Sequence, residues 1–434
     1  MKIKTFFEYE HPKEDICSAL GLNNEESRER FCKFLKKSNF YDCFSVSSKA
    51  VYPQSWVGSI CYKHKQIEIL PKLLNKTTTN NNVDSKIDEK ERVNILNNLI
   101  FMLAYTHKLE IRTVDNTFIN KSPNPFLEIL IREFAESLFE ALKRQMPYSY
   151  VRNAGNLKYL KGKLKITENI KYNCCDRTKF YCEYDEFSEH NALNRLFYWV
   201  TTLLKKISCN NYNQVTLTHI LNYYGDMELE NFMSGKVGRI KLTRTQEIFK
   251  KPFMLAKMFV EHASVDFSSH RINSIALLWD MNKLFEEFIC EIIRHNANRF
   301  NCGVVTQKGR KLLKNDISKK RNTFVDILVK TKDKKIVIDT KYKKFASVDD
   351  FSNADVFQVS TYCLLHNAKH AILLYPQWDN EIKYDYLLNT DDSDEYHIQF
   401  ETVDLKIKNL KQDLSNSDTS KICRKLDDIL HTRV

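Results

Sequence analysis

The fold of the last third of the chain is decided by Thr323-Phe324-Val325-Asp326-Ile327-Leu328-Val329 and, after a polar turn, by Lys335-Ile336-Val337-Ile338-Asp339-Thr340-Lys341-Tyr342-Lys343. Both runs are rich in β-branched residues, and the polar segment between them is typical of a turn, so the pattern predicts a β-hairpin. Each predicted strand carries an acidic residue, Asp326 or Asp339, among apolar neighbours. A buried carboxylate is costly unless it is paired, hydrogen-bonded or bound to a cation.

The spacing of the charged residues in this hairpin predicts a cluster. Asp339 and Lys341 are two residues apart and therefore project from the same face of their strand, and Asp326 reaches that face if the register allows. Two carboxylates and an ammonium group suit metal-dependent phosphodiester hydrolysis. The acids would hold Mg²⁺, and the metal would neutralise phosphate charge and acidify water. The lysine would orient that water, help to deprotonate it, or stabilise the transition state. An ordinary hairpin with a surface Asp–Lys pair is the alternative.

The elements around the hairpin predict an α/β module with a mixed sheet. We expect a helix at about residues 276–298, a second helix at about residues 354–365 and a further strand at His370–Tyr375. Composition and periodicity divide the chain into four predicted segments. These are a β-rich N-terminal region (1–75), a low-complexity linker or loop (76–90), a mainly helical body (91–265) and the α/β domain (266–434).

Composition narrows the class of protein. The 434 residues carry a net charge of +12, which favours a polyanionic partner such as nucleic acid. The sequence contains no G-x-x-x-x-G-K-[ST] loop, so we expect that this chain binds no nucleotide itself. No run is long and apolar enough for a membrane span and no secretory signal is recognisable, so we expect a cytoplasmic protein with no membrane contact. The twelve cysteines contain no C-x-x-C pair and are expected to be free thiols.

A basic run precedes the hairpin and ends at its first strand. Seven cations lie between Lys308 and Arg321, and cations there would contact phosphates without reading sequence. A solvated loop is the alternative for this run, and a surface lysine is the alternative for Lys343. Duplex DNA is the expected substrate, because no strand interleaves basic and aromatic residues as single-strand binders do. The candidate DNA contacts are Arg310, Lys311, Lys319, Lys320, Arg321 and Lys343.

Several motifs resemble a known family. Asp326…Asp339-Thr340-Lys341 resembles the PD-(D/E)xK nuclease signature, with Val325 in the place of proline. Gln358 and Tyr362 resemble the Q-x-x-x-Y element that follows this motif in many such nucleases. Asp280-Met281-Asn282-Lys283-Leu284-Phe285-Glu286-Glu287-Phe288 resembles the M-N-x-L-F-E-x-F stretch of the McrC family, the nuclease subunits of McrBC-type modification-dependent restriction systems.

Looser resemblances to the McrC family extend upstream. Ile67-Glu68-Ile69-Leu70-Pro71-Lys72, preceded by Val57-Gly58, resembles the family's N-terminal hairpin. Leu160-Lys161-Gly162-Lys163-Leu164 is similar to its L-R-G-R-[IL] element, and Glu189-His190-Asn191-Ala192-Leu193-Asn194-Arg195 to the stretch that ends in N-R. The Asn-rich insert at residues 76–86 matches nothing in the family.

The resemblance implies a function for the chain and a different role for each of its regions. The C-terminal region would be a PD-(D/E)xK domain that cuts duplex DNA with Mg²⁺, or with Mn²⁺ as an alternative. The N-terminal region and the helical body would dock on a GTP-hydrolysing AAA+ McrB-like motor and stimulate it, and that partner would read the modified base. The implied catalytic residues are Asp326, Asp339, Lys341, Glu286 and Gln358, with Asp326 and Asp339 as metal ligands and Tyr362 as a further DNA contact.

Two other classes of protein fit the same residues. One is a non-catalytic activator or scaffold subunit that keeps the nuclease fold for clamping DNA. The other is a stand-alone PD-(D/E)xK nuclease, which would cut DNA without a GTP-hydrolysing partner.

Overall fold

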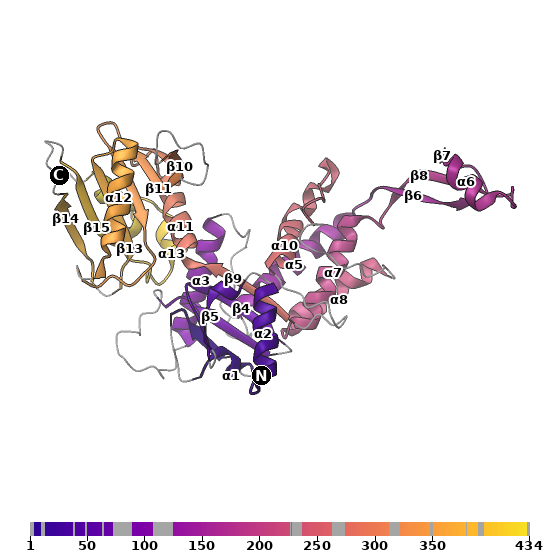
Figure 1. Cartoon of the computed structure of the whole chain (residues 1–434), viewed down its shortest axis with the longest axis horizontal. Helices are drawn as coiled ribbons and strands as arrows, with labels where there is room; N and C mark the ends of the chain where they lie inside the picture. Colours follow the sequence, from indigo (N-terminus) through magenta and orange to yellow (C-terminus); the bar gives the residue numbers. More distant parts are fainter. Residues whose placement is uncertain are drawn as a thin grey trace. The chain divides into compact units, whose positions relative to one another are not determined.

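The protein forms two compact units in the computed structural model (Figure 1). One, here called the helical unit, comprises mainly residues 122–277 with 61–65. The other, the sheet unit, comprises residues 2–60, 66–121 and 278–434. The structure describes residues 4–9, 14–37, 40–47, 50–62, 65–72, 89–106, 125–225, 227, 237–262, 274–311, 322–347, 350–378, 380–388 and 395–431. The predicted linker at 76–90 lies almost wholly outside them.

A six-stranded mixed sheet is the centre of the sheet unit, with the strand order β10-β11-β12-β13-β15-β14. The pairs β10–β11, β11–β12 and β14–β15 are antiparallel, whereas β12–β13 and β13–β15 are parallel. The mixed α/β character predicted for this region is therefore confirmed. The strands are β10 (Gly303–Lys311), β11 (Asn322–Lys330), β12 (Lys335–Thr340), β13 (His370–Pro376), β14 (Lys383–Leu387) and β15 (His397–Val403).

Helices flank this sheet. Helix α12 (Asn353–His366) connects β12 to β13 and packs against both strands, and Figure 1 shows it lying across the sheet. Helix α11 (Met281–His295) packs against β10 and β12, and α14 (Lys421–His431) packs against β15. Among the described residues of the sheet unit, the other helices are α1 (Ile16–Ala19), α2 (Glu25–Lys37), the 3₁₀ turn η1 (Tyr41–Cys43), α3 (Glu89–Tyr105) and α13 (Leu410–Leu414).

A second sheet has the strand order β1-β5-β4-β9, formed by β1 (Lys4–Phe7), β5 (Lys65–Leu70), β4 (Trp56–Tyr62) and β9 (Ser274–Asp280). Strand β9 corrects one prediction, because the helix expected from about residue 276 begins only at Met281. An apolar run without a clear period fits a strand or a helix equally well, and here every residue from Ser274 to Trp279 is buried in the sheet. The Asp280 carboxylate accepts a hydrogen bond from the backbone N–H of Asn282 at 3.0 Å and so caps α11.

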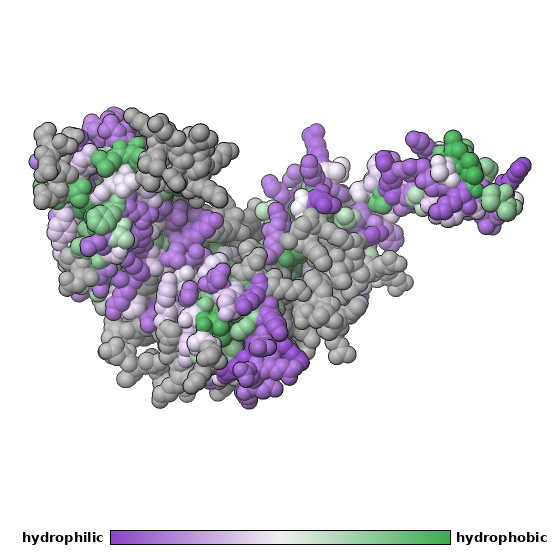
Figure 2. Space-filling model, viewed as in Figure 1, coloured by the Kyte–Doolittle hydropathy of each residue, from purple (hydrophilic) through white to green (hydrophobic). Residues whose placement is uncertain are grey.

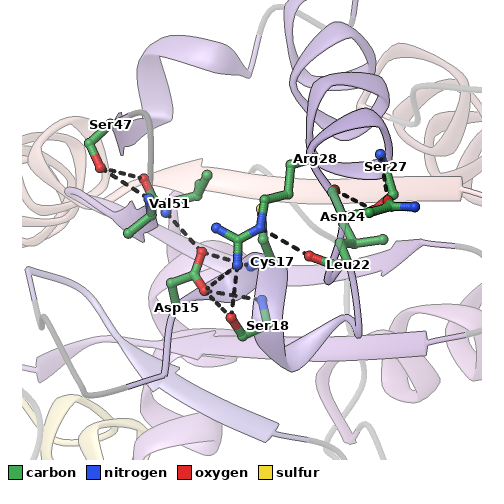
Figure 3. A network of polar contacts seen from close by, with 10 residues as sticks. Asp15, Cys17, Ser18, Leu22, Asn24, Ser27, Arg28, Ser47 and Val51 are labelled. Carbon is green, nitrogen blue, oxygen red and sulfur yellow. Dashed lines mark hydrogen bonds and ion pairs between the residues drawn. The ribbon is translucent and has the colours of Figure 1, made fainter.

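A polar network joins the short helices near the N-terminus to β3 (Val51–Pro53), which pairs with β2 (Phe44–Val46). The Asp15 carboxylate accepts hydrogen bonds from the N–H groups of Ser18 at 3.1 Å and Val51 at 3.1 Å (Figure 3). Arg28 of α2 lies 3.5 Å from the same carboxylate and donates to the Leu22 carbonyl at 3.0 Å. One acid therefore caps α1 and connects α1, α2 and β3.

Replacing Asp15 by alanine is expected to lower the free energy of unfolding by about 2 kcal/mol. The substitution removes a helix cap and leaves the Val51 N–H and the Arg28 guanidinium without this acceptor. Burial opposes the charge on Asp15, but the hydrogen bonds from Ser18 and Val51 and the charge of Arg28 outweigh it and lower the pKa of Asp15. Urea denaturation of both proteins measures the loss, which an unchanged midpoint would contradict.

The helical unit is built from α5 (Pro125–Arg144), α7 (Ala192–Ile207), α8 (Asn211–Tyr224), the 3₁₀ segment η3 (Arg244–Phe249) and α10 (Lys250–His262). Helix α8 packs against both α5 and α7, and α10 packs against the same two helices. No helix among the described residues meets the length and apolarity that crossing a bilayer requires. The helical periodicity of this region is confirmed, although α3, predicted as part of the same body, belongs to the sheet unit.

A long hairpin interrupts the helical unit and was not predicted. Strands β6 (Ser149–Leu157) and β8 (Phe180–Ser188) pair antiparallel, β7 (Lys163–Leu164) adds to β8, and α6 (Ile166–Asn173) packs against β8. In Figure 1 the hairpin reaches away from α7 and α8. Strand β6 has polar residues at many positions, so its sequence lacks the apolar alternation that indicates a strand. In the structure, none of its residues is buried.

The far end of this hairpin is tightly built and carries apolar surface. Gly162 has a φ of +70°, and a Cβ there would lie 2.5 Å from the Glu183 carbonyl oxygen, so only glycine fits. Leu160, Ile166 and Ile170 are each more than 60% exposed, and hydrophobic atoms gather at this end in Figure 2. A group of exposed apolar side chains of this kind is typical of an interaction surface.

Candidate active site

The two predicted acids lie opposite each other on neighbouring strands. The register of β11 and β12 pairs Ile327 with Ile338, so the next position along the ladder places Asp326 opposite Asp339. Thr331 N–H donates to the Lys334 carbonyl at 2.9 Å and closes the predicted turn. Strand β12 lies between β11 and β13 and is buried from Ile336 to Asp339, which explains its unbroken β-branched run.

Lys341 lies just beyond the end of β12, two residues after Asp339. Its N–H donates to the Leu374 carbonyl of β13 at 2.9 Å, which extends the ladder by one residue. Its Nζ lies 2.8 Å from Oδ2 of Asp339 and donates to Oε1 of Gln358 at 2.9 Å. The Gln358 amide in turn donates to the Tyr362 hydroxyl at 2.8 Å. Helix α12 therefore supplies a glutamine and a tyrosine, one turn apart, that hold the lysine beside the acid.

Asp355 joins this site although the sequence did not single it out. Its carboxylate lies 3.8 Å from Nζ of Lys341 and 2.5 Å from Nζ of Lys343. The signal was its position three residues before Gln358, which places both residues on one face of α12. Lys343, predicted as a DNA contact, is thus held by an ion pair, with 38% of its side chain exposed.

Asp339 is fully buried. Whether the site suits a cation depends on the hydrogen bonds that the oxygens of the Asp339 carboxylate accept. Although the Lys341 ammonium forms an ion pair with it, neither oxygen accepts a geometrically acceptable hydrogen bond from any described residue. The opposite acid, Asp326, accepts one from the Thr340 N–H at 3.2 Å. Two facing carboxylates with unfilled acceptor positions are the donor set of a hard cation.

The electrostatics of the pair also fit a cation. Burial raises the pKa of Asp339 to about 6, the charge of Asp326 adds to the rise, and Lys341 opposes it. Burial also raises the pKa of Asp326. Within the described ranges, no group of three His, Cys, Asp or Glu side chains is placed to bind a metal, so Asp326 and Asp339 are the candidate pair of carboxylate ligands. Mg²⁺ sites in which the protein contributes one or two carboxylates have this character.

The raised pKa predicts how the metal-free protein responds to pH. Because the folded state binds the Asp339 proton more tightly than the unfolded state, Asp339 makes the fold less stable as pH rises from about 4 to 6. The loss is about 3 kcal/mol for a shift from 3.8 to about 6. Urea denaturation of wild type and Asp339→Asn across this range should show the difference growing with pH. A difference that is constant with pH would contradict the raised pKa.

The remaining predicted site residues are Glu286 and the cations of the basic run that precedes the hairpin. Glu286 is half-buried on α11, next to Phe285, whose ring packs 5.9 Å from the ring of Tyr342. Strand β10 includes the backbone of Arg310 and Lys311 and pairs with β11, so the alternative of a solvated loop is wrong for Lys308–Lys311. Lys319, Lys320 and Arg321 lie outside the described residues. The role of Glu286 and the DNA contacts of the basic run stay predictions.

Two solved structures are similar to this chain, and the first of them supports the fold described above. A chain in the refined half-complex from the tetradecameric assembly of Thermococcus gammatolerans McrB AAA+ hexamers with bound McrC is similar in fold, with a TM-score of 0.70 and 20% identity over 99% of this chain and 100% of that one. A chain in the cryo-EM structure of the T. gammatolerans McrBC complex matches with a TM-score of 0.49 and 24% identity, over 72% of this chain and 90% of that one. No curated protein sequence matches the chain.

The family assignment comes from the sequence itself. The model of the family described as "McrBC 5-methylcytosine restriction system component" matches residues 51–376, which is most of the chain and includes Asp326, Asp339, Lys341, Gln358 and Tyr362. The chain therefore belongs to the McrBC family of restriction-system components.

Proposed function

We propose that this chain is the Mg²⁺-dependent endonuclease subunit of a McrBC-like restriction complex and cuts duplex DNA. The observation that carries the proposal is the pair of facing acids, Asp326 and Asp339, with Lys341 beside them and with buried carboxylate oxygens that accept no hydrogen bond among the described residues. A scaffold would have no use for such a pair, because two facing buried carboxylates beside a single lysine cost folding free energy.

Each residue of the site has its own role in the proposed cleavage reaction. Asp326 and Asp339 would hold the metal, which when bound supplies neutralisation of phosphate charge and acidification of water. Burial lowers the pKa of Lys341, but the charges of Asp339, Asp355 and Asp326 outweigh it and raise that pKa, so the side chain is an ammonium at neutral pH. Lys341 therefore acts as a donor that orients the water or stabilises the transition state, rather than as a base. Gln358 holds the ammonium in place.

A GTP-hydrolysing AAA+ partner completes the proposal. The similar Thermococcus structure contains McrC bound to McrB AAA+ hexamers, and the family description names 5-methylcytosine restriction. We infer that this chain likewise docks on a McrB-like motor, stimulates it, and cuts DNA with a modified base that the partner recognises. The exposed apolar end of the β6–β8 hairpin is our candidate for part of that contact.

Reconstitution tests the function. The purified chain would be mixed with a candidate McrB-like motor, and nicking of 5-methylcytosine-containing and unmethylated plasmid would be followed with Mg²⁺, with and without GTP. We expect cleavage only when motor, GTP and modified DNA are all present. Cleavage by the chain alone would point to a stand-alone nuclease. A rise in GTP hydrolysis without cleavage under any condition would point to a non-catalytic activator.

A further inference from the structure

The residue that follows Lys341 contacts a distant part of the chain. Tyr342 is 2% exposed, and its hydroxyl donates a hydrogen bond to Oε1 of Glu8 at 2.7 Å. Glu8 and Tyr342 are 334 positions apart in the sequence, and both belong to the sheet unit. The backbone just beyond β12 is thereby joined to the segment that follows β1.

Glu8 is itself fixed in place. Its side chain is completely buried, its N–H donates to the Leu70 carbonyl at 3.1 Å, and its Oε1 also accepts from the Lys72 N–H at 3.0 Å. These bonds lie at the end of the parallel β1–β5 pair, which aligns Phe7 with Leu70. A buried carboxylate is expensive, and one that accepts from a tyrosine and a backbone N–H is held in a single position.

The backbone at Lys341 needs such an anchor. Strand β12 ends at Thr340, and beyond it the Lys341 N–H donates to Leu374 while the Lys343 N–H turns back to the Lys341 carbonyl at 3.0 Å. The backbone thus leaves the sheet at Lys341, and the ammonium group of this residue must stay beside Asp339. The buried ring of Tyr342 packs 5.9 Å from the ring of Phe285 and so holds the backbone immediately after Lys341.

We propose that Glu8 and Tyr342 are positioning residues for the nuclease site. Their hydrogen bond fixes the backbone that carries Lys341 to the end of the β1–β5 pair, so a displacement of that pair would move the lysine relative to Asp339. The inference rests on the proposed nuclease function and adds to it a mechanical connection between the N-terminal sheet and the reacting groups.

The test compares three variants of the full-length chain. Tyr342→Phe removes the hydroxyl, and Glu8→Gln keeps an acceptor oxygen. Asn98→Ala serves as the control, because it removes two hydrogen bonds of a buried side chain in the same unit, to Ile407 at 2.7 Å and from Leu410 at 3.1 Å, without touching a site residue. The first readout is hydrogen exchange in peptides covering residues 338–346. The second is the single-turnover cleavage rate and DNA affinity of the complex with motor and GTP.

We expect Tyr342→Phe to speed exchange in residues 338–346 and to lower the cleavage rate by about tenfold with DNA affinity unchanged, since a misplaced catalytic group costs rate rather than binding. Glu8→Gln should stay close to wild type, and Asn98→Ala should change neither readout. If Tyr342→Phe matches Asn98→Ala in both, the bond is only structural and the inference is overturned. If the wild type never cleaves DNA, the proposed function fails, and the exchange comparison still decides whether the anchor exists.

Discussion

The Asp339→Asn variant is expected to cut DNA at least about 10³-fold more slowly than wild type in the assembled complex, because the substitution removes one of the two carboxylates that would hold the metal. Asparagine has nearly the same shape, so the strand pairing on both sides of residue 339 should persist. DNA binding and stimulation of the partner's GTP hydrolysis should stay within about twofold of wild type, since a loss confined to the transition state affects the cleavage rate alone. Single-turnover cleavage of modified duplex DNA measures the effect.

Glu401→Gln is the matched control for that substitution. Glu401 is a second fully buried acid of the same sheet, on β15, and its carboxylate is paired with Lys425 at 2.6 Å. Removing its charge breaks a buried ion pair away from the site, so it should lower stability and leave the cleavage rate unchanged. Equal losses of cleavage in both variants would mean that Asp339 supports the fold and not the chemistry.

The order of stability of wild type and Asp339→Asn is expected to reverse when metal is added. Without metal, the variant should be more stable by about 1–3 kcal/mol, because the substitution removes a buried charge that faces Asp326. With Mg²⁺ or Mn²⁺ at about 100 times its dissociation constant, wild type should gain about 2.7 kcal/mol. The variant should gain little, because it lacks one of the two ligands. Thermal unfolding in EDTA and in excess metal measures both differences.

The control for this second prediction is again Glu401→Gln, which should respond to metal as wild type does. The stabilisation would then depend on the acid at position 339 and not on buried acids in general. If metal stabilised Asp339→Asn as much as wild type, the ion would bind elsewhere, and Asp326 and Asp339 would have another role.

Local sequence patterns predicted the part of the site that depends on local structure. The β11–β12 hairpin follows from two β-branched runs around a polar turn, and the shared face of Asp339 and Lys341 follows from strand parity. The common face of Gln358 and Tyr362 follows from helical spacing in the same way. The contact between the two elements, from Lys341 to Gln358, was implied only by the resemblance to PD-(D/E)xK nucleases, because no local pattern fixes how a helix packs on a sheet.

What the sequence did not predict depends on contacts between distant segments. The hydrogen bond from Tyr342 to Glu8 joins residues 334 positions apart, and nothing in either local stretch indicates its partner. Strand β9 resembled the start of a helix because its apolar run has no clear period, and only its pairing in the sheet decides between the two. The β6–β8 hairpin was missed because it buries few side chains and is held mainly by its backbone ladder.

The most direct test of the account is to locate the metal by anomalous diffraction from crystals of the full-length chain grown with Mn²⁺. The account predicts one strong peak in contact with the carboxylates of both Asp326 and Asp339 in wild type, and its loss in Asp339→Asn. A wild-type crystal with no peak at this pair, or with a peak that persists in the variant, would contradict the claim that these two acids form the catalytic centre of a metal-dependent nuclease.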